Sequence, residues 1–156
     1  MKKLSIIIIV INLIALLIYF NYSMRQKEDI LKNGKLVLLE LAPVDPRSLM
    51  QGDYMRLAYE IQDNFVIDSI PKRGFVVLKV DNNQVGKSIR CQPNREPLNP
   101  GEFLIEYTRP ESWLLNIGAE SYFFEEGTGQ RYENAKYGGL KIDENGNSLL
   151  IGLYDE

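Results

Sequence analysis

Residues 140–153 read LKIDENGNSLLIGL and predict a β-hairpin near the end of the chain. Two mostly apolar runs, residues 140–143 and 148–153, flank the turn Glu144-Asn145-Gly146-Asn147. An Asn-Gly pair favours a tight hairpin turn, because both residues tolerate a positive φ. We therefore expect the two runs to pair as antiparallel strands.

Strand patterns recur toward the N-terminus. Residues 75–80 (FVVLKV) are rich in β-branched side chains, and Asp81-Asn82-Asn83 predicts a turn onto a second strand at residues 85–92. Residues 54–61 (YMRLAYEI) alternate in a way that predicts a half-buried strand with one apolar face. Further strands are expected at residues 35–41, 102–108, 113–117 and 121–124.

One short helix is expected at residues 129–137 (GQRYENAKY), ending at Gly138-Gly139 as a C-cap. About eight to ten short strands with one short helix predict a mainly β domain, either a small barrel or a sandwich.

Residues 4–20 form an apolar run long enough to span a bilayer core, with Ser5 and Asn12 as its polar members. No small-x-small cleavage site follows it, which favours an uncleaved signal anchor over a signal peptide. We expect an anchor at residues 1–23, a helical or irregular stem at 24–34, and a strand-rich domain at 35–156. Basic residues lie on both sides of the run, so their distribution does not decide its orientation. The position of the run near the N-terminus is typical of a signal anchor and favours a domain outside the cytoplasm.

The composition excludes several kinds of chemistry. The 156 residues include no histidine and one cysteine, Cys91. A Ser-His-Asp triad, a Cys-His pair, the usual zinc sites and an internal disulfide are therefore excluded. Without Lys2 and Lys3, the remaining 16 basic and 21 acidic residues leave a net charge of −5, which argues against nucleic-acid binding. We expect no cofactor and no metal, with Cys91 as a small buried residue in a strand.

A compact motif lies at the start of the second expected strand, where residues 52–59 read GDYMRLAY. Gly52 permits a sharp backbone turn, and the Asp53 carboxylate can accept hydrogen bonds from nearby backbone N–H groups. A structural role accounts for this pattern. The alternative is a binding role, in which Asp53 acts together with Arg47 or Arg56.

The same motif resembles the signature of a known family. It fits the string G-D-Y-x-x-L-x-Y at Gly52, Asp53, Tyr54, Leu57 and Tyr59. This resembles the GDYXXLXY family, a group of membrane-anchored bacterial proteins without an assigned activity. Further similarity lies at residues 119–127, 132–133, 138–143 and 150–153. The resemblance implies a single-pass protein of the bacterial cytoplasmic membrane with an exported domain and an integral-membrane protein partner, and it implies no reaction.

A weaker local similarity concerns the β-domain of a bacterial signal peptidase. The matching positions are Leu49, Gly52 and Asp53. The nucleophile is not matched, because its place falls on Val44. An envelope hydrolase that pairs Ser48 with Lys79 or Lys87 is the alternative, since burial can lower the pKa of a lysine enough for it to act as a base.

The leading hypothesis is a non-enzymatic binding or accessory protein, and a purely structural envelope component is a third possibility. Tyr54 and Tyr59 fall on opposite strand faces, so we expect one in the core and one at the surface. An interaction surface would use whichever aromatic side chains are exposed together. The candidates are Tyr54, Tyr107, Trp113, Tyr122 and Phe123. The sequence identifies no small-molecule ligand.

Overall fold

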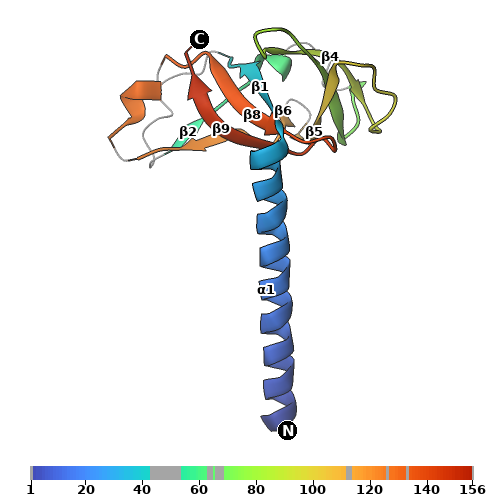
Figure 1. The fold of residues 1–156 in the computed structure, drawn as a ribbon, viewed down its shortest axis with the longest axis vertical. Helices are drawn as coiled ribbons and strands as arrows, with labels where there is room; N and C mark the ends of the chain where they lie inside the picture. Colours follow the sequence, from blue (N-terminus) through green and yellow to red (C-terminus); the bar gives the residue numbers. More distant parts are fainter. Residues whose placement is uncertain are drawn as a thin grey trace.

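A long helix carries a strand-rich domain at its C-terminal end (Figure 1). The computed structural model describes residues 2–42, 54–62, 65, 69–111, 114–125, 127–132 and 134–155. Helix α1 spans Lys2–Asn33. Within this described part it is the one helix long and apolar enough to cross a membrane, a criterion that a signal sequence near the N-terminus also meets. The helix is thus compatible with a single-pass anchor.

The junction between α1 and the domain is short and hydrogen-bonded. Gly34 alone separates α1 from the first strand, β1 (Lys35–Glu40). The Gly34 N–H donates to the Ile30 carbonyl at 2.9 Å, and Lys141 Nζ donates to the Gly34 carbonyl at 2.8 Å. Ile30 is buried at the same place. The stem is therefore helical throughout and continuous with the apolar run.

The described strands of the domain form three antiparallel sheets. The first has the order β1-β8-β9, with β8 at Tyr137–Ile142 and β9 at Ser148–Tyr154. The second has the order β4-β3-β5-β6 and comprises β3 (Arg73–Val80), β4 (Gly86–Gln92), β5 (Glu102–Glu111) and β6 (Leu114–Asn116). The third pairs β2 (Tyr54–Arg56) with β7 (Ser121–Phe123). Two 3₁₀ turns, η2 (Glu60–Gln62) and η4 (Gly129–Tyr132), complete the described elements.

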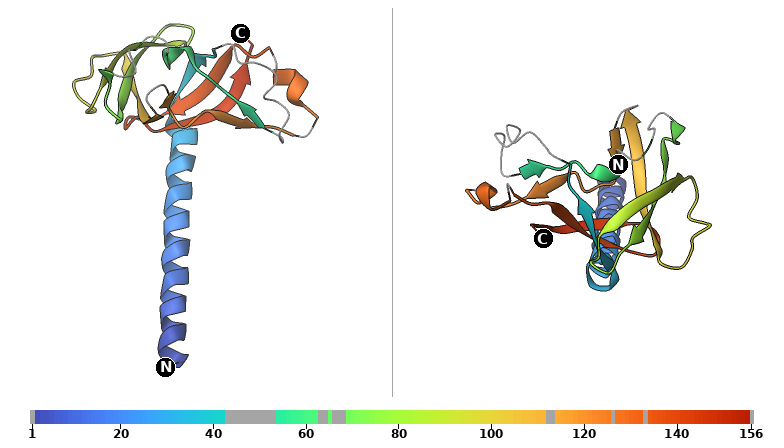
Figure 2. Two further views of the ribbon diagram at one scale, coloured as in Figure 1. Left: turned by 180° about the vertical axis from the view of Figure 1, so that it is seen from behind. Right: turned by 90° about the horizontal axis from the view of Figure 1, so that it is seen from above.

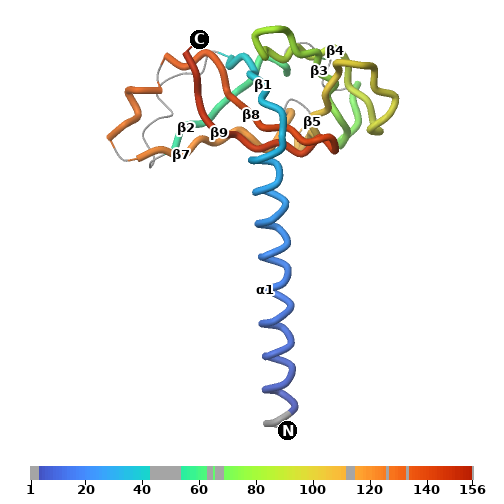
Figure 3. Tube along the Cα trace, in the orientation of Figure 1, coloured from blue at the N-terminus to red at the C-terminus, as the bar shows by residue number. Residues whose placement is uncertain are grey.

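The sheets spread over the end of α1 in different directions. The β2–β7 pair lies on one side of the helix axis and the β4-β3-β5-β6 sheet lies on the other (Figure 3). The β1-β8-β9 sheet lies between them, as the view along the helix also shows (Figure 2). The molecule therefore consists of a long helix with a broad β domain at its C-terminal end.

One apolar core connects the sheets. It is built from buried side chains of β1, β3, β5, β6 and β8 and of the segments that follow β2 and β6. Its members are Val37, Leu39, Leu57, Tyr59, Ile61, Val76, Leu78, Ile105, Tyr107, Leu115, Ile117, Ala119, Leu140 and Ile142. Burial of apolar side chains is the main stabilising contribution in such a domain, so the sheets form one cooperative unit.

The structure confirms the mainly β class preceded by one apolar helix, and the described strands form open sheets instead of a closed barrel. Both expected hairpins are present, β3–β4 and β8–β9. In the β8–β9 turn Gly146 has φ +89°, and the Asp143 carboxylate accepts the Asn145 and Asn147 N–H groups at 2.9 and 2.8 Å. The hairpin forms as expected, but only Gly146 has a positive φ, and the Asp143 carboxylate supplies the remaining support for the turn.

The helix expected at residues 129–137 is wrong, since only the 3₁₀ turn η4 forms there and β8 begins at Tyr137. Gly138 and Gly139 lie inside β8 and do not cap a helix. A Cβ atom on Gly138 would lie 2.8 Å from a ring carbon of Tyr59, and one on Gly139 would overlap the Tyr154 ring. These glycines are required because two aromatic rings lie directly against the strand.

The strand expected at residues 54–61 is shorter than its alternation suggests. β2 ends at Arg56, and Tyr59 makes only an isolated antiparallel bridge to Leu41 before η2 begins. Tyr59 is 1% exposed, whereas Tyr54 is only half-buried, so the two motif tyrosines do differ in burial.

Candidate functional site

The second half of the G-D-Y-x-x-L-x-Y motif packs into the core. Leu57 is buried, and its N–H donates to the Glu120 carbonyl at 2.9 Å. The Tyr59 hydroxyl donates to the Ala119 carbonyl at 2.7 Å. Burial, and then the nearby Glu120 carboxylate, raises the pKa of Tyr59 above its usual range, so the hydroxyl stays protonated as a donor. Leu57 and Tyr59 thus fasten the motif to the segment that leads into β7.

The segment that receives these bonds is itself held in place. Glu120 accepts hydrogen bonds from the Ile117 and Gly118 N–H groups through its Oε1 atom. Gly118 has φ +81°, a left-handed conformation that favours glycine. The two strands of the β2–β7 pair are therefore positioned by a fixed turn on one strand and by a buried tyrosine on the other.

The first half of the motif leads onto an exposed surface. In the register of β2 and β7, Tyr54 lies opposite Phe123 and Met55 lies opposite Tyr122. The Tyr54 and Phe123 ring centroids are 5.7 Å apart, and the Phe123 side chain is 75% exposed. Phe123 thus presents most of its ring to solvent beside the half-buried Tyr54.

Phe124 and Tyr132 form a second aromatic group with Tyr122, which packs against the core on the opposite face of β7 from Phe123. Tyr132 packs against Tyr122, with centroids 5.2 Å apart in an edge-to-face arrangement, and against Phe124 at 5.6 Å. We call the two neighbouring groups together, Tyr54, Tyr122, Phe123, Phe124 and Tyr132, the aromatic surface. A hydrogen bond to Tyr132, and then partial burial, raises the pKa of Tyr122, so the Tyr122 hydroxyl remains neutral near physiological pH.

A shallow groove of about 540 Å³ runs along the aromatic surface. Glu125, Thr128 and Arg131 line it beside the rings, and Glu125 and Arg131 are exposed. The groove therefore combines apolar faces with one acidic and one basic side chain. This combination suits a protein surface, where aromatic and arginine side chains contribute most of the binding energy.

The aromatic candidates from the sequence separate into different places. Tyr54, Tyr122 and Phe123 come together, whereas Tyr107 is fully buried and its hydroxyl donates to the Pro71 carbonyl at 3.2 Å. Trp113 lies outside the described residues. Sequence reasoning missed Phe124 and Tyr132, because the incorrect helix at residues 129–137 separated Tyr132 from the strand it contacts.

Several predicted site residues lie outside the described part of the chain: Arg47, Ser48, Gly52 and Asp53. Arg56 is exposed at the end of β2, opposite Ser121. Lys79 and Lys87 face each other across β3 and β4, and both are exposed. They therefore lack the burial that the hydrolase alternative requires of its lysine base.

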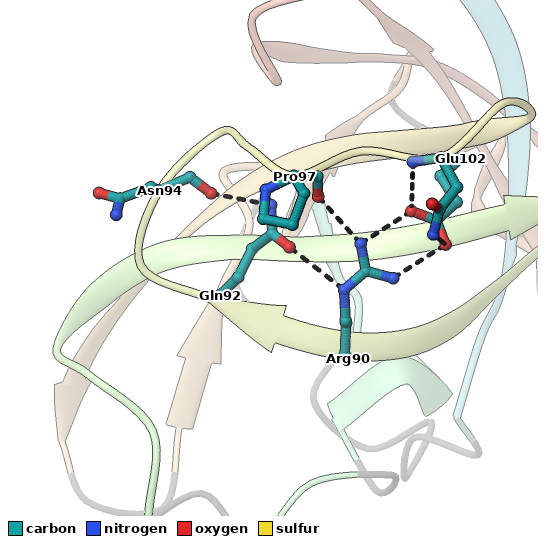
Figure 4. Close-up of polar contacts among 6 residues, drawn as sticks. Arg90, Gln92, Asn94, Pro97 and Glu102 are labelled. Carbon is teal, nitrogen blue, oxygen red and sulfur yellow. Dashed lines mark hydrogen bonds and ion pairs between the residues drawn. The ribbon is translucent and has the colours of Figure 1, made fainter.

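A polar cluster around Arg90 and Glu102 is structural (Figure 4). Arg90 donates two hydrogen bonds to the Glu102 carboxylate, both at 2.8 Å, and a third to the Pro97 carbonyl at 3.0 Å. Asn99 donates to the same carboxylate through its N–H and its Nδ2 atom. The cluster ties the loop between β4 and β5 to its own strands, which leaves it little capacity for a ligand.

The other chemically notable groups also have structural surroundings. Cys91 lies in a strand as expected, on β4, but it is half-buried instead of fully buried, and it packs against the core. Burial raises the pKa of its thiol to about 11. A thiol with this pKa is a poor nucleophile at neutral pH. Within the described ranges, His, Cys, Asp and Glu side chains form no group of three that could hold a metal ion.

Comparison with known proteins gives one match. A family model described as "GDYXXLXY protein" matches residues 16–153. No curated protein and no solved structure matches the chain. The matched range contains the strands of the described residues, except for Tyr154 at the end of β9, and the C-terminal half of α1.

Proposed function

Because the chain belongs to the GDYXXLXY protein family and begins with one apolar helix, we propose that it is a single-pass membrane protein with a non-enzymatic binding role. In this proposal α1 remains as an uncleaved anchor in the bacterial cytoplasmic membrane. The strand-rich domain then lies outside the cytoplasm and acts as an accessory to an integral-membrane protein.

The observation that carries the binding role is the aromatic surface. Phe123 extends into solvent from a two-stranded pair that is otherwise anchored by the buried Tyr59 and the Glu120 turn. A rigid support beneath an exposed aromatic side chain reduces the entropy lost on binding, which is how small surfaces reach useful affinity. The fully paired Arg90–Glu102 cluster and the exposed Lys79 and Lys87 offer no comparable site for catalysis.

The motif extends this proposal toward residues 47–53. β2 begins at Tyr54, directly after Gly52 and Asp53 in the sequence. We therefore propose that Asp53, with Arg47 or Arg56, binds the same partner as the aromatic surface. This proposal assigns the first half of the motif to recognition and the second half, Leu57 and Tyr59, to packing.

Substitution of Phe123 tests the binding role. We expect the Phe123→Ser protein, crosslinked in native membranes and purified at full length, to lose an integral-membrane partner that the wild type recovers. Ile89→Ser is the matched control, because Ile89 is also an exposed apolar side chain (46%) but lies on β4, away from the aromatic surface. Equal recovery of the partner with Phe123→Ser and Ile89→Ser, or equal loss of it, would contradict the proposal. An Asp53→Ala variant measured in parallel tests the motif in the same way.

The side of the membrane can be tested with single cysteines. In a Cys91→Ser background, a cysteine replacing the exposed Lys87 should react with a membrane-impermeant maleimide in intact cells. A cysteine replacing Lys3 should react only after the membrane is opened. The reverse labelling pattern would place the domain in the cytoplasm. Loss of the N-terminal segment from the mature protein would show that this segment is a cleaved signal peptide and not an anchor.

A further inference from the structure

A set of polar side chains spaced seven residues apart lies on one face of α1, whereas Asn21 lies on the opposite face. Within the apolar run and just beyond it, Ser5, Asn12, Tyr19 and Gln26 follow one another at a spacing of seven residues. An α-helix drifts by only about 20° per seven residues, so these four side chains stay within about 60° of one another. Ala15, three residues after Asn12, falls on the same face and leaves room for a neighbouring backbone.

Asn12 lies at the midpoint of the apolar run, with eight residues of residues 4–20 on either side. Its carboxamide has two N–H donors and one oxygen acceptor. The hydrogen bond described for it is long, from Nδ2 to the Ile8 carbonyl at 3.5 Å, whereas Asn21 makes the equivalent bond to Leu17 at 2.9 Å. At the centre of a bilayer there is no water to satisfy the remaining capacity, so such residues usually face another protein.

The same face of α1 leads into a groove beneath the domain. Ser23, Gln26 and Ile30 form its helical wall, and its roof includes Glu106 and Asn116. Other polar members of the lining are Lys27, Asp29, Thr108, Asp143, Asn145, Asn147 and Ser148. The groove holds about 540 Å³, and Gln26 belongs both to it and to the polar face. A polar face in the membrane thus continues into a polar recess above it.

We propose that this face, Ser5, Asn12 and Tyr19, binds a transmembrane helix of the integral-membrane partner, with a polar side chain of that helix hydrogen-bonded to Asn12. The inference rests on the proposed function and assigns the partner's place of contact within the membrane. The partner's helix ends at about the level of Ser23, and the loop that follows it occupies the groove. The amide and hydroxyl groups of the lining suit a polar loop of this kind.

A second copy of this chain fits the same face less well. Its α1 would run parallel to the first and would have to continue to Asn33 before reaching its own domain. The roof of the groove lies over this face beside Ile30 and would obstruct a helix packed along it. Figure 1 shows the domain broadening directly above the end of α1. The partner helix that binds here therefore ends closer to the membrane than α1 does.

Photocrosslinking within the membrane tests this inference. A benzophenone-bearing residue is placed in the full-length protein either at Tyr19, on the polar face, or at Leu17, on the opposite face. We expect the probe at Tyr19, and not the probe at Leu17, to crosslink to a membrane-spanning segment of another protein. Mass spectrometry should show a polar residue near the middle of that segment.

Asn12 variants supply the second measurement. With the probe at Tyr19, Asn12→Leu should lower crosslinking about 3- to 20-fold, the range expected for one interhelical hydrogen bond, and Asn12→Gln should largely restore it. Val10→Leu, on the opposite face, is the matched control and should change nothing.

Three outcomes would overturn the inference. They are a crosslinked product of two copies of this 17.9 kDa chain, equal crosslinking from both probe positions, and crosslinking that is unaffected by Asn12→Leu. The Phe123→Ser variant distinguishes a failure of this inference from a failure of the proposed function. If a partner is still lost with Phe123→Ser while the Tyr19 probe finds no helix, the accessory role stands and only the membrane contact fails.

Discussion

The Glu102 carboxylate is the most strongly perturbed acid of the described residues outside α1. Hydrogen bonds from Arg90, and then from Asn99, lower its pKa from 4.5 to about 2. Its stabilising contribution is therefore present above the ordinary carboxyl pKa and is lost as the pH falls from about 4.5 toward 2. The side chain has 10% of its surface exposed, so the bidentate pair with Arg90 is shielded from much of the solvent.

We expect Glu102→Gln to lower the stability of the protein near neutral pH and to flatten its loss of stability between about pH 4.5 and pH 2. Thermal unfolding followed by circular dichroism across this pH range measures both effects. Glu96→Gln, in the same exposed loop, is the control and should reproduce the wild-type profile. A Glu102→Gln profile that keeps the wild-type slope would show that the carboxylate does not carry the pH dependence.

At the scale of elements, β8 depends on a glycine that no local pattern explains. Gly138 lies against the Tyr59 ring, and an added Cβ would approach ring atoms at 2.8 to 3.3 Å. Both neighbours are fixed, because Tyr59 is hydrogen-bonded to the Ala119 carbonyl and Gly138 is paired with β1 and β9.

Gly138→Ala should therefore destabilise the domain by about 1 to 3 kcal/mol, the usual cost of overpacking a core. Chemical denaturation of the purified full-length protein measures the difference. Gly129→Ala is the matched control, since its Cβ would make only ordinary contacts of 3.4 Å and 3.5 Å with the Phe124 ring. Equal stability of the two variants would show that the Tyr59 ring can move away.

The same glycine shows how far sequence reasoning reaches. Hairpins β3–β4 and β8–β9 could be predicted because turn residues and β-branched runs act over a few neighbouring positions. The role of Gly138 could not, because its reason is Tyr59, which is distant in the sequence. In the sequence Gly138-Gly139 therefore resembles a helix C-cap, and the preceding residues predict a helix that the structure does not contain.

The candidate site was predictable to a similar extent. The sequence identifies Tyr54, Tyr122 and Phe123 as candidates because they lie in expected strands, but alternation does not separate them from Tyr107. β5 buries Leu104 and Ile105 in succession, so both of its faces are covered and the face of a residue does not decide its exposure. Tyr132 required the tertiary packing of η4 against β7.

At the scale of the whole molecule, α1 fixes the direction in which the domain faces. The helix is unbroken through Asn33, and Gly34 is bonded to both Ile30 and Lys141. Each residue added to a helix turns whatever follows it by about 100° and raises it by about 1.5 Å. The polar face of α1 and the aromatic surface therefore keep a fixed angular relation.

Insertions after Met24 test this relation. Two added alanines should turn the domain by about 200° and raise it by about 3 Å, whereas four should turn it by about 40° and raise it by about 6 Å. If one partner contacts both surfaces, two alanines should abolish its capture and four should preserve most of it. Co-purification from crosslinked membranes measures this, and a greater loss with four alanines would show that height matters more than direction.

The unbroken helix has a further consequence for which partners are accessible. The 13 residues from Asn21 to Asn33 continue α1 beyond the apolar run and measure about 20 Å along the axis. In the anchored form proposed above, this segment holds the domain away from the lipid headgroups. A membrane protein whose loops are flush with the bilayer could not touch the aromatic surface, so this length selects partners that extend roughly the same 20 Å from the membrane.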